Sequence, residues 1–268
     1  ITYSDMIIAS PAYSLDPVYA DVFKADNHTS PEIIFPIAFD GERTRTWGGT
    51  TFLVHAEVGG SMVAADYGID GGWFGLRTTS SLVDLFPDET GTADERAIFY
   101  TNGQTKDIAS IPDFTAGYAV PKFVNITSTG ATGSSLSHPD TDFPLMRLAD
   151  VYLMYAEAVL RGGTGGDTAQ AVAYVNALRT RAYGDATGNI TAAELTLPFI
   201  LDERARELYW EAHRRTDLIR FGLFTDAGVW PWKGGVAAGR TTEAYRDLLP
   251  IPSSELLANP NLTQNPGY

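Results

Sequence analysis

Between residues 200 and 222 the apolar positions recur at steps of three or four, which predicts an α-helix. The apolar stripe consists of Leu201, Ala205, Leu208 and Ala212. A second stripe, at steps of four, carries Glu203, Glu207 and Glu211, interleaved with Arg204, Arg206, Arg214 and Arg215. Upstream, Thr191 and Glu194 form a capping-box pattern, so we expect one long helix from there to Gly222.

The three aligned carboxylates of this helix need an explanation. Like charges four residues apart repel each other by about 0.2–0.5 kcal/mol per pair. One interpretation is acid–base chemistry, as in glycoside hydrolysis. The other is a set of ion-paired fasteners that hold neighbouring loops on the helix. The interleaved arginines favour fasteners, because an arginine-paired carboxylate has a lowered pKa and is a poor proton donor.

The helical period also occurs earlier in the chain. One helix is expected to start after Pro144 and to stop at Gly162-Gly163, and the next to run from Asp167 to Gly184. This is an αα-hairpin that resembles one tetratricopeptide unit. A single unit cannot bury its own faces, so we expect the hairpin to stack on other parts of the protein.

The first 140 residues show little periodicity. Residues 32–39 (EIIFPIAF) predict a short strand, which Pro36 confines to an edge or a bulge. Short helices are expected at residues 18–24 and 81–86. The rest is loop, and loops of this length are usually functional or cover another element.

Aromatic residues flanked by glycine stand out in these loops. Trp73-Phe74 lies between Gly71-Gly72 and Gly75, and Trp47 precedes Gly48-Gly49. Glycine neighbours leave the rings free to present a face to a ligand. The alternative is that these large apolar side chains are buried in the hydrophobic core.

Composition narrows the possible functions. The 268 residues suit one large domain or two small ones, and the net charge of −14 argues against nucleic acid as a partner. Cysteine is absent, which excludes disulfides, a thiolate nucleophile and a cysteine metal site. The four histidines show no metal or triad spacing, and no loop has EF-hand spacing. We expect no cofactor; a structural Ca²⁺ is conceivable but not indicated.

Three motifs, in this order and spacing, resemble the C-terminal half of the SusD/RagB family. They are DFPLMRLADVYLMYAEAVLRGG (142–163), DERARELYWEAHRRTDLIRFG (202–222) and LLPIPSSELLANPNLTQNPGY (248–268). WPWKGG (230–235) between the last two fits as well. The resemblance is strong over residues 141–268 and weaker over residues 30–125.

The resemblance implies a fold, a location and a function. The fold is mainly α with long irregular loops and few short strands, on a tetratricopeptide-like helical scaffold. Family members are lipoproteins on the surface of the outer membrane in Bacteroidetes-type bacteria. They capture glycans, or in some members peptides, and deliver them to a SusC-type TonB-dependent transporter; they are not enzymes.

From the resemblance we expect the chain to be a single C-terminal domain, with the family's N-terminal repeat-containing half and its lipidated cysteine absent from this sequence. A loop-rich ligand-facing portion (1–140) precedes a helical scaffold (141–222) and an extended C-terminal strap (223–268).

The resemblance also implies roles for particular residues. The scaffold network contains Glu203, Arg204, Glu207, Glu211, Asp217, Arg147 and Asp150. The ligand face is expected to draw on Tyr67, Trp73, Phe74 and Arg77, with Trp47 next. A pyranose presents C–H groups that stack on an aromatic plane, while charged groups bind its hydroxyls. Trp230 and Trp232 are interpreted as structural. Peptide capture, glycoside hydrolysis through paired glutamates and a purely protein-binding role are the alternatives.

Overall fold

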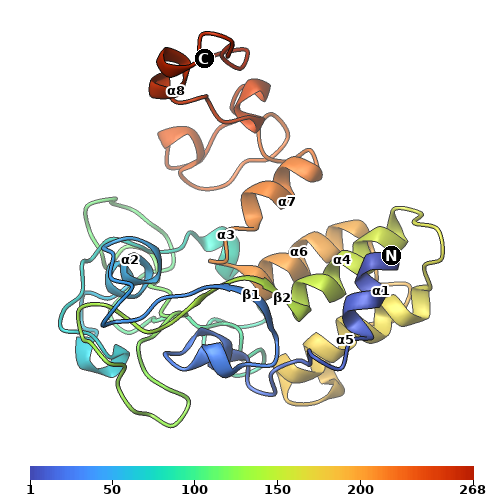
Figure 1. Ribbon diagram of the computed structural model, residues 1–268, viewed down its shortest axis with the longest axis horizontal. Helices are drawn as coiled ribbons and strands as arrows, with labels where there is room; N and C mark the ends of the chain where they lie inside the picture. Colours follow the sequence, from blue (N-terminus) through green and yellow to red (C-terminus); the bar gives the residue numbers. More distant parts are fainter. The chain divides into compact units, whose positions relative to one another are not determined.

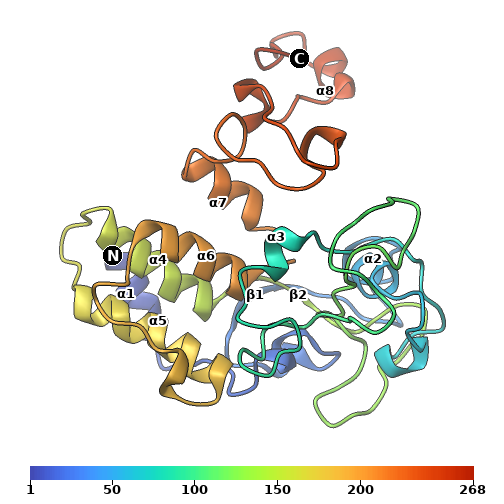
Figure 2. The same ribbon diagram turned by 180° about the vertical axis from the view of Figure 1, so that it is seen from behind.

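The computed structural model describes all residues from 1 to 268 and shows two compact units, Ile1–Ala212 and His213–Tyr268. The first unit has a helical end, where α1, α4, α5 and α6 lie together, and a loop-rich end around α2 (Figures 1 and 2). A two-stranded sheet of β1 and β2 lies between the two ends. The expected mainly helical, loop-rich fold class is confirmed.

The helical end confirms the predicted hairpin. It consists of α4 (Leu148–Leu160) and α5 (Thr168–Tyr183), with α1 (Thr2–Ile8) and α6 (Leu197–Leu208) packed on α4. The carboxylate of Asp167 caps α5 by accepting a hydrogen bond from the Gln170 N–H at 2.8 Å. Gly184 ends the helix at a φ of +72°. The buried core of this end includes Leu153, Ala156, Val175, Leu178, Ile200 and Leu208.

The predicted strand is present as β1 (Ile33–Ile37), and it pairs antiparallel with β2 (Phe143–Arg147). Pro36 lies opposite Pro144, next to a shift in the register between Phe35 and Pro36. Both prolines thus lie on edge strands beside an irregularity, as the sequence predicted for Pro36. The helix expected directly after Pro144 is therefore wrong in its start. Residues 143–147 extend to pair with β1, and α4 begins only at Leu148.

The prediction of one long helix from Thr191 to Gly222 is also wrong. The Thr191 hydroxyl and N–H donate to the Glu194 carboxylate at 2.7 and 2.8 Å. These capping-box contacts stabilise a turn and do not begin a helix. Helix α6 begins at Leu197, capped by Thr196, and ends at Leu208. The following residues leave the helix, with Trp210 and Ala212 at φ of +64° and +65°.

The break after α6 has a visible cause. The Tyr209 hydroxyl donates to the Arg96 carbonyl at 2.6 Å, and the Tyr209 carbonyl accepts from the Lys122 ammonium at 2.6 Å. Glu211 is buried between Arg147 and Lys122. These contacts with distant segments replace the helical hydrogen bonds that continuation would have made.

The loop-rich end contains two short α-helices, α2 (Gly49–Ala56) and α3 (Ser80–Val83), and the 3₁₀ helices η1 (Tyr19–Phe23), η2 (Asn27–Thr29) and η3 (Ala64–Tyr67). A further 3₁₀ turn, η4 (Ala186–Gly188), follows α5. Periodicity did not predict α2, because its Thr50, Thr51 and Val54 are β-branched and weak helix formers. The core of this end is formed mainly by Tyr19, Val22, Phe23, Val54, Ile69, Phe114 and Phe123.

The second unit contains α7 (Arg214–Arg220), η5 (Lys233–Gly235), η6 (Ala244–Asp247) and α8 (Ser253–Ala258). This unit contains the whole of the expected strap (223–268) and the ten residues before it. Within the unit, Trp230 packs against Phe224 and the Lys233 ammonium. None of the helices of either unit combines the length and the apolar character needed to cross a membrane.

Candidate functional site

Exposed rings gather at the loop-rich end of the first unit. Trp47 is 64% exposed and Trp73 is 40% exposed, and their ring centroids lie 6.1 Å apart. His138 lies 4.5 Å from the Trp47 ring, and Phe52 of α2 lies 6.3 Å from the Trp73 ring. We call Trp47, Phe52, Trp73 and His138 the aromatic surface. It brings together three segments that are far apart in the sequence: the stretch of Trp47 and Phe52, the loop of Trp73 and the loop of His138.

Trp73 is held in place by the backbone and by a buried ring beneath it. Its indole stacks on the imidazole of His55, with centroids 4.8 Å apart and planes 19° from parallel. The Trp73 N–H donates to the His55 carbonyl at 2.8 Å. His55 Nδ1 lies 2.7 Å from the Gly71 carbonyl oxygen, which can only accept, so Nδ1 donates. A Cβ at Gly72 would lie 2.1 Å from the Val58 carbonyl oxygen, so only glycine permits this close approach.

Polar groups adjoin the rings. The Ser137 hydroxyl donates to the Asp70 carboxylate, and the Asp70 N–H donates to the Leu136 carbonyl at 3.1 Å. These bonds join the loop that carries His138 to the loop that carries Trp73. Stacking faces with an imidazole and a carboxylate close by suit a ligand with apolar C–H faces and many hydroxyls.

The other three residues expected at the ligand face contact different groups. Phe74 packs edge-on against Phe114, with centroids 5.6 Å apart. The Arg77 guanidinium donates to the carbonyls of Ile111, Ala116 and Asp113, so it fastens a neighbouring loop instead of projecting toward a ligand. Tyr67 is half-buried against the core, and burial raises its pKa to about 12.

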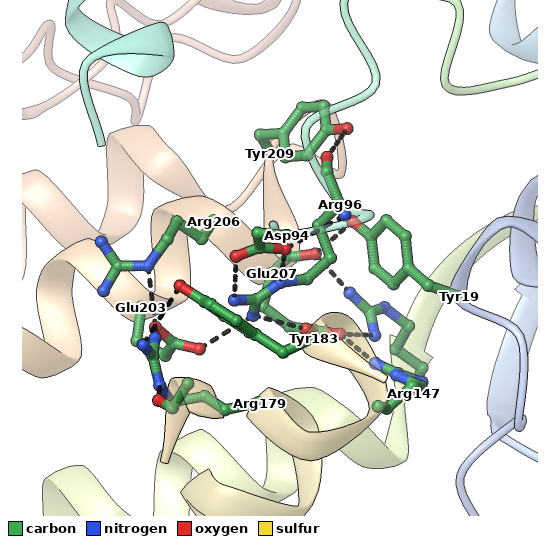
Figure 3. A network of polar contacts seen from close by, with 12 residues as sticks. Tyr19, Asp94, Arg96, Arg147, Arg179, Tyr183, Glu203, Arg206, Glu207 and Tyr209 are labelled. Atoms are coloured by element: carbon green, nitrogen blue, oxygen red, sulfur yellow. Dashed lines mark hydrogen bonds and ion pairs between the residues drawn. The ribbon is translucent and has the colours of Figure 1, made fainter. Parts of the chain in front are cut away.

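The acidic residues of α6 lie inside the protein. Glu207 is fully buried, and its carboxylate lies 2.6 Å from Arg147 and 3.1 Å from Arg96 (Figure 3). The same carboxylate lies 2.5 Å from Arg181. Arg147 also bonds Glu32 at 2.6 Å. We call this set of buried ion pairs the arginine–glutamate network.

Glu203 and Glu211 extend the network in both directions. Glu203 pairs with Arg96, Arg179 and Arg206 at 2.7–2.8 Å. Glu211 pairs with Arg147 and Lys122, both at 2.7 Å. The remaining expected members pair as Arg204–Asp150 at 2.8 Å and Asp217–Arg220 at 2.7 Å, the latter within α7 of the second unit.

The electrostatics of these carboxylates do not suit proton donation. Burial alone would raise the pKa of Glu203, but Arg96, Arg206 and Arg179 outweigh it and lower the pKa to about 2. The pKa of Glu207 is lowered further in the same way, by Arg181, Arg147 and Arg96 against the effect of burial. A general acid at neutral pH needs a raised pKa and access to substrate, and these fully buried groups have neither.

Sequence reasoning missed several members of both sites. Phe52 and His138 of the aromatic surface, and His55 beneath Trp73, lie in segments without a recognisable motif. The network partners that were missed are Glu32, Asp94, Arg96, Lys122, Arg179 and Arg181. Most are single charged residues in loops, and only the folded chain shows that they are buried.

One buried carboxyl stands apart from the network. Glu57 directly follows α2 and is fully buried, and no side chain pairs with its carboxylate. The Phe123 backbone N–H and the Lys122 ammonium favour its charged form too weakly to offset burial. Burial raises its pKa well above the usual value of a carboxyl. The structure contains no group of three or more His, Asp or Glu residues arranged to hold a metal ion.

Residues 97–268 match the SusD family, and the chain belongs to that family. This confirms the resemblance carried by the three C-terminal motifs. Among curated proteins, the chain is 35% identical to the starch-binding protein SusD of Bacteroides thetaiotaomicron, over 99% of the chain and 55% of that protein. It is 29% identical to the SusD-like protein P25 of Formosa agariphila, over 98% of the chain and 54% of that protein.

Solved structures agree with this assignment. The surface glycan-binding protein A of Bacteroides thetaiotaomicron, solved in complex with laminarihexaose, matches with a TM-score of 0.72 and 26% identity. The match covers 98% of this chain and 58% of that one. The chain thus spans about half the length of the relatives it matches.

Proposed function

We propose that this chain is the glycan-holding part of a non-catalytic, cell-surface capture protein. The captured oligosaccharide or polysaccharide is passed on to a SusC-type TonB-dependent transporter in the outer membrane. The observation that carries the proposal is the pair of exposed indoles, Trp47 and Trp73, 6.1 Å apart on the aromatic surface.

The names of the relatives support a carbohydrate ligand. One is a starch-binding protein, and another was solved with laminarihexaose bound. The chemistry of the aromatic surface fits the same class, because tilted aromatic planes can stack on successive sugar rings. The buried, arginine-paired state of Glu203 and Glu207 supports capture without hydrolysis.

Affinity electrophoresis and calorimetry against starch, laminarin and a panel of other polysaccharides test the proposal. We expect at least one polysaccharide to bind, and Trp47→Ala and Trp73→Ala each to weaken that binding at least about tenfold, equivalent to about 1.4 kcal/mol. Tyr3→Ala, which removes an 82% exposed ring from α1, is the matched control and leaves binding unchanged.

Other results would point elsewhere. Glycan retention that is unaffected by both tryptophan substitutions contradicts the proposal and favours a protein-binding role. Binding of extended peptides instead of glycans, lost in the same two variants, identifies the surface as a peptide site. Release of reducing sugar by the pure protein, abolished in Glu207→Gln, would restore the hydrolase interpretation.

A further inference from the structure

Glu57 directly follows α2, within the stretch of chain to which the loop of Trp73 is attached. We propose that Glu57 is a positioning residue for the aromatic surface. Its neutral carboxyl group keeps residues 55–58 in the conformation that holds Trp73, and loss of its proton releases this loop and weakens glycan binding. The inference rests on the proposed function and adds a dependence of that function on pH.

The loop of Trp73 is attached to residues 55–58 by consecutive backbone hydrogen bonds. The N–H groups of residues 73–76 all donate to carbonyl oxygens within residues 55–58, at 2.7–3.1 Å. The His55 ring adds a hydrogen bond to the Gly71 carbonyl at 2.7 Å and stacks on the Trp73 indole. A movement of residues 55–58 therefore moves Trp73 as well.

The surroundings of the Glu57 carboxyl group do not suit a negative charge. The residue is fully buried, and no side chain pairs with its oxygens. The groups that face it are the Phe123 backbone N–H and the side chains of Lys122, Tyr67 and Tyr209. The Lys122 ammonium donates instead to the Tyr209 carbonyl at 2.6 Å and to the Glu211 carboxylate at 2.7 Å. In this place the carboxyl group is therefore more stable without its charge.

Protonation of Glu57 links the position of the loop to pH. Burial raises the pKa of Glu57 well above the usual carboxyl value, so the folded protein keeps this proton to a higher pH than the unfolded chain does. When residues 55–58 open to solvent, the carboxyl group regains its ordinary pKa and ionises. Between these two pKa values, each pH unit favours the open form by about tenfold.

Opening lowers the affinity for glycans because it releases Trp73. The apparent affinity of a site falls in proportion to the fraction of protein that is competent to bind. Lys122, Asp70 and His138 also titrate in or near the site, and burial lowers the pKa of Lys122 to about 8. These groups remain when Glu57 alone is replaced, so a comparison with that variant isolates the contribution of Glu57.

The test compares the wild-type 268-residue chain with Glu57→Gln, which keeps the shape of the side chain and cannot ionise. Calorimetry with maltoheptaose and laminarihexaose at pH 6 and pH 8.5 measures the affinity, and circular dichroism checks that both proteins remain folded. We expect the affinity of the wild type, divided by that of the variant, to fall at least about threefold between the two pH values. Glu255→Gln, which neutralises an exposed carboxylate in α8, is the matched control and should follow the wild type.

Hydrogen exchange on the free protein tests the position of the loop without any glycan. The protection factors of the amides of residues 73–76 should fall between pH 6 and pH 8.5 more steeply in the wild type than in Glu57→Gln. Equal protection profiles in the two proteins overturn the inference. So does an affinity ratio that is independent of pH while Trp73→Ala weakens binding. If the protection factors change as expected but Trp73→Ala leaves glycan binding unchanged, Glu57 positions the loop as inferred and the proposed function fails instead.

Discussion

Glu207→Gln tests whether the arginine–glutamate network stabilises the fold. Glu207 is fully buried, and its carboxylate contacts three arginines within 3.1 Å. Removing its charge while keeping its shape leaves Arg147, Arg181 and Arg96 buried with one counter-charge too few. Breaking a buried ion pair in this way costs about 3–5 kcal/mol, a large share of the roughly 5–15 kcal/mol that stabilises a typical domain.

The stability difference between the wild type and Glu207→Gln should also depend on pH. Because the folded-state pKa of Glu207 is depressed, its contribution is present above the unfolded-state pKa and is lost as the pH falls. With an unfolded-state pKa of about 4.3, the wild type loses about 1 kcal/mol from this group between pH 7 and pH 3.5, and the variant loses none. The difference in stability between the two proteins therefore shrinks by that amount.

Urea denaturation at pH 7 and pH 3.5, followed by tryptophan fluorescence and circular dichroism, measures both effects. Glu42→Gln, which neutralises an exposed carboxylate in a loop, is the matched control and should change the stability by less than about 0.5 kcal/mol. A cost below about 1 kcal/mol at pH 7, or a cost that is the same at both pH values, would refute the reasoning.

Two further predictions concern the segments on either side of the aromatic surface. Glu57→Gln should stabilise the protein at neutral pH. The raised folded-state pKa means that the unfolded chain releases its proton first, so wild-type stability falls as the pH rises. Between the ordinary carboxyl pKa and the raised folded-state pKa, the gain should grow by about 1.4 kcal/mol per pH unit, and above the folded-state pKa it should level off. Thermal melts from pH 4 to pH 8 that show a constant difference throughout would contradict this. Gly72→Ala should weaken glycan binding at least about tenfold, because the new Cβ would clash with Val58 and displace Trp73. Gly71→Ala, whose Cβ meets nothing within 4 Å, is the calorimetric control and should bind normally.

The sequence was informative where structure depends on neighbouring residues. Helical periodicity and the Asp167 cap predicted the α4–α5 hairpin, and the glycines beside Trp47 and Trp73 indicated two rings that the structure brings together. Each of these signals lies within a short stretch of chain.

Features that depend on distant segments were not predictable in the same way. The 143–147 segment is extended because Ile33–Ile37 is available to pair with it. Helix α6 ends at Leu208 because Arg96, Lys122 and Arg147 hold Tyr209 and Glu211. His138 joins Trp47 through a loop about ninety residues away in the sequence. No local sequence pattern predicts contacts between residues this far apart in the chain.

The arginine–glutamate network also bears on how the chain is made. Its members come from residues 32 to 211, so the set is incomplete until nearly the whole first unit has been synthesised. Until then these groups remain hydrated charges of both signs. The first unit can therefore reach its final form only after Glu211, the last member in the sequence, has joined Arg147 and Lys122.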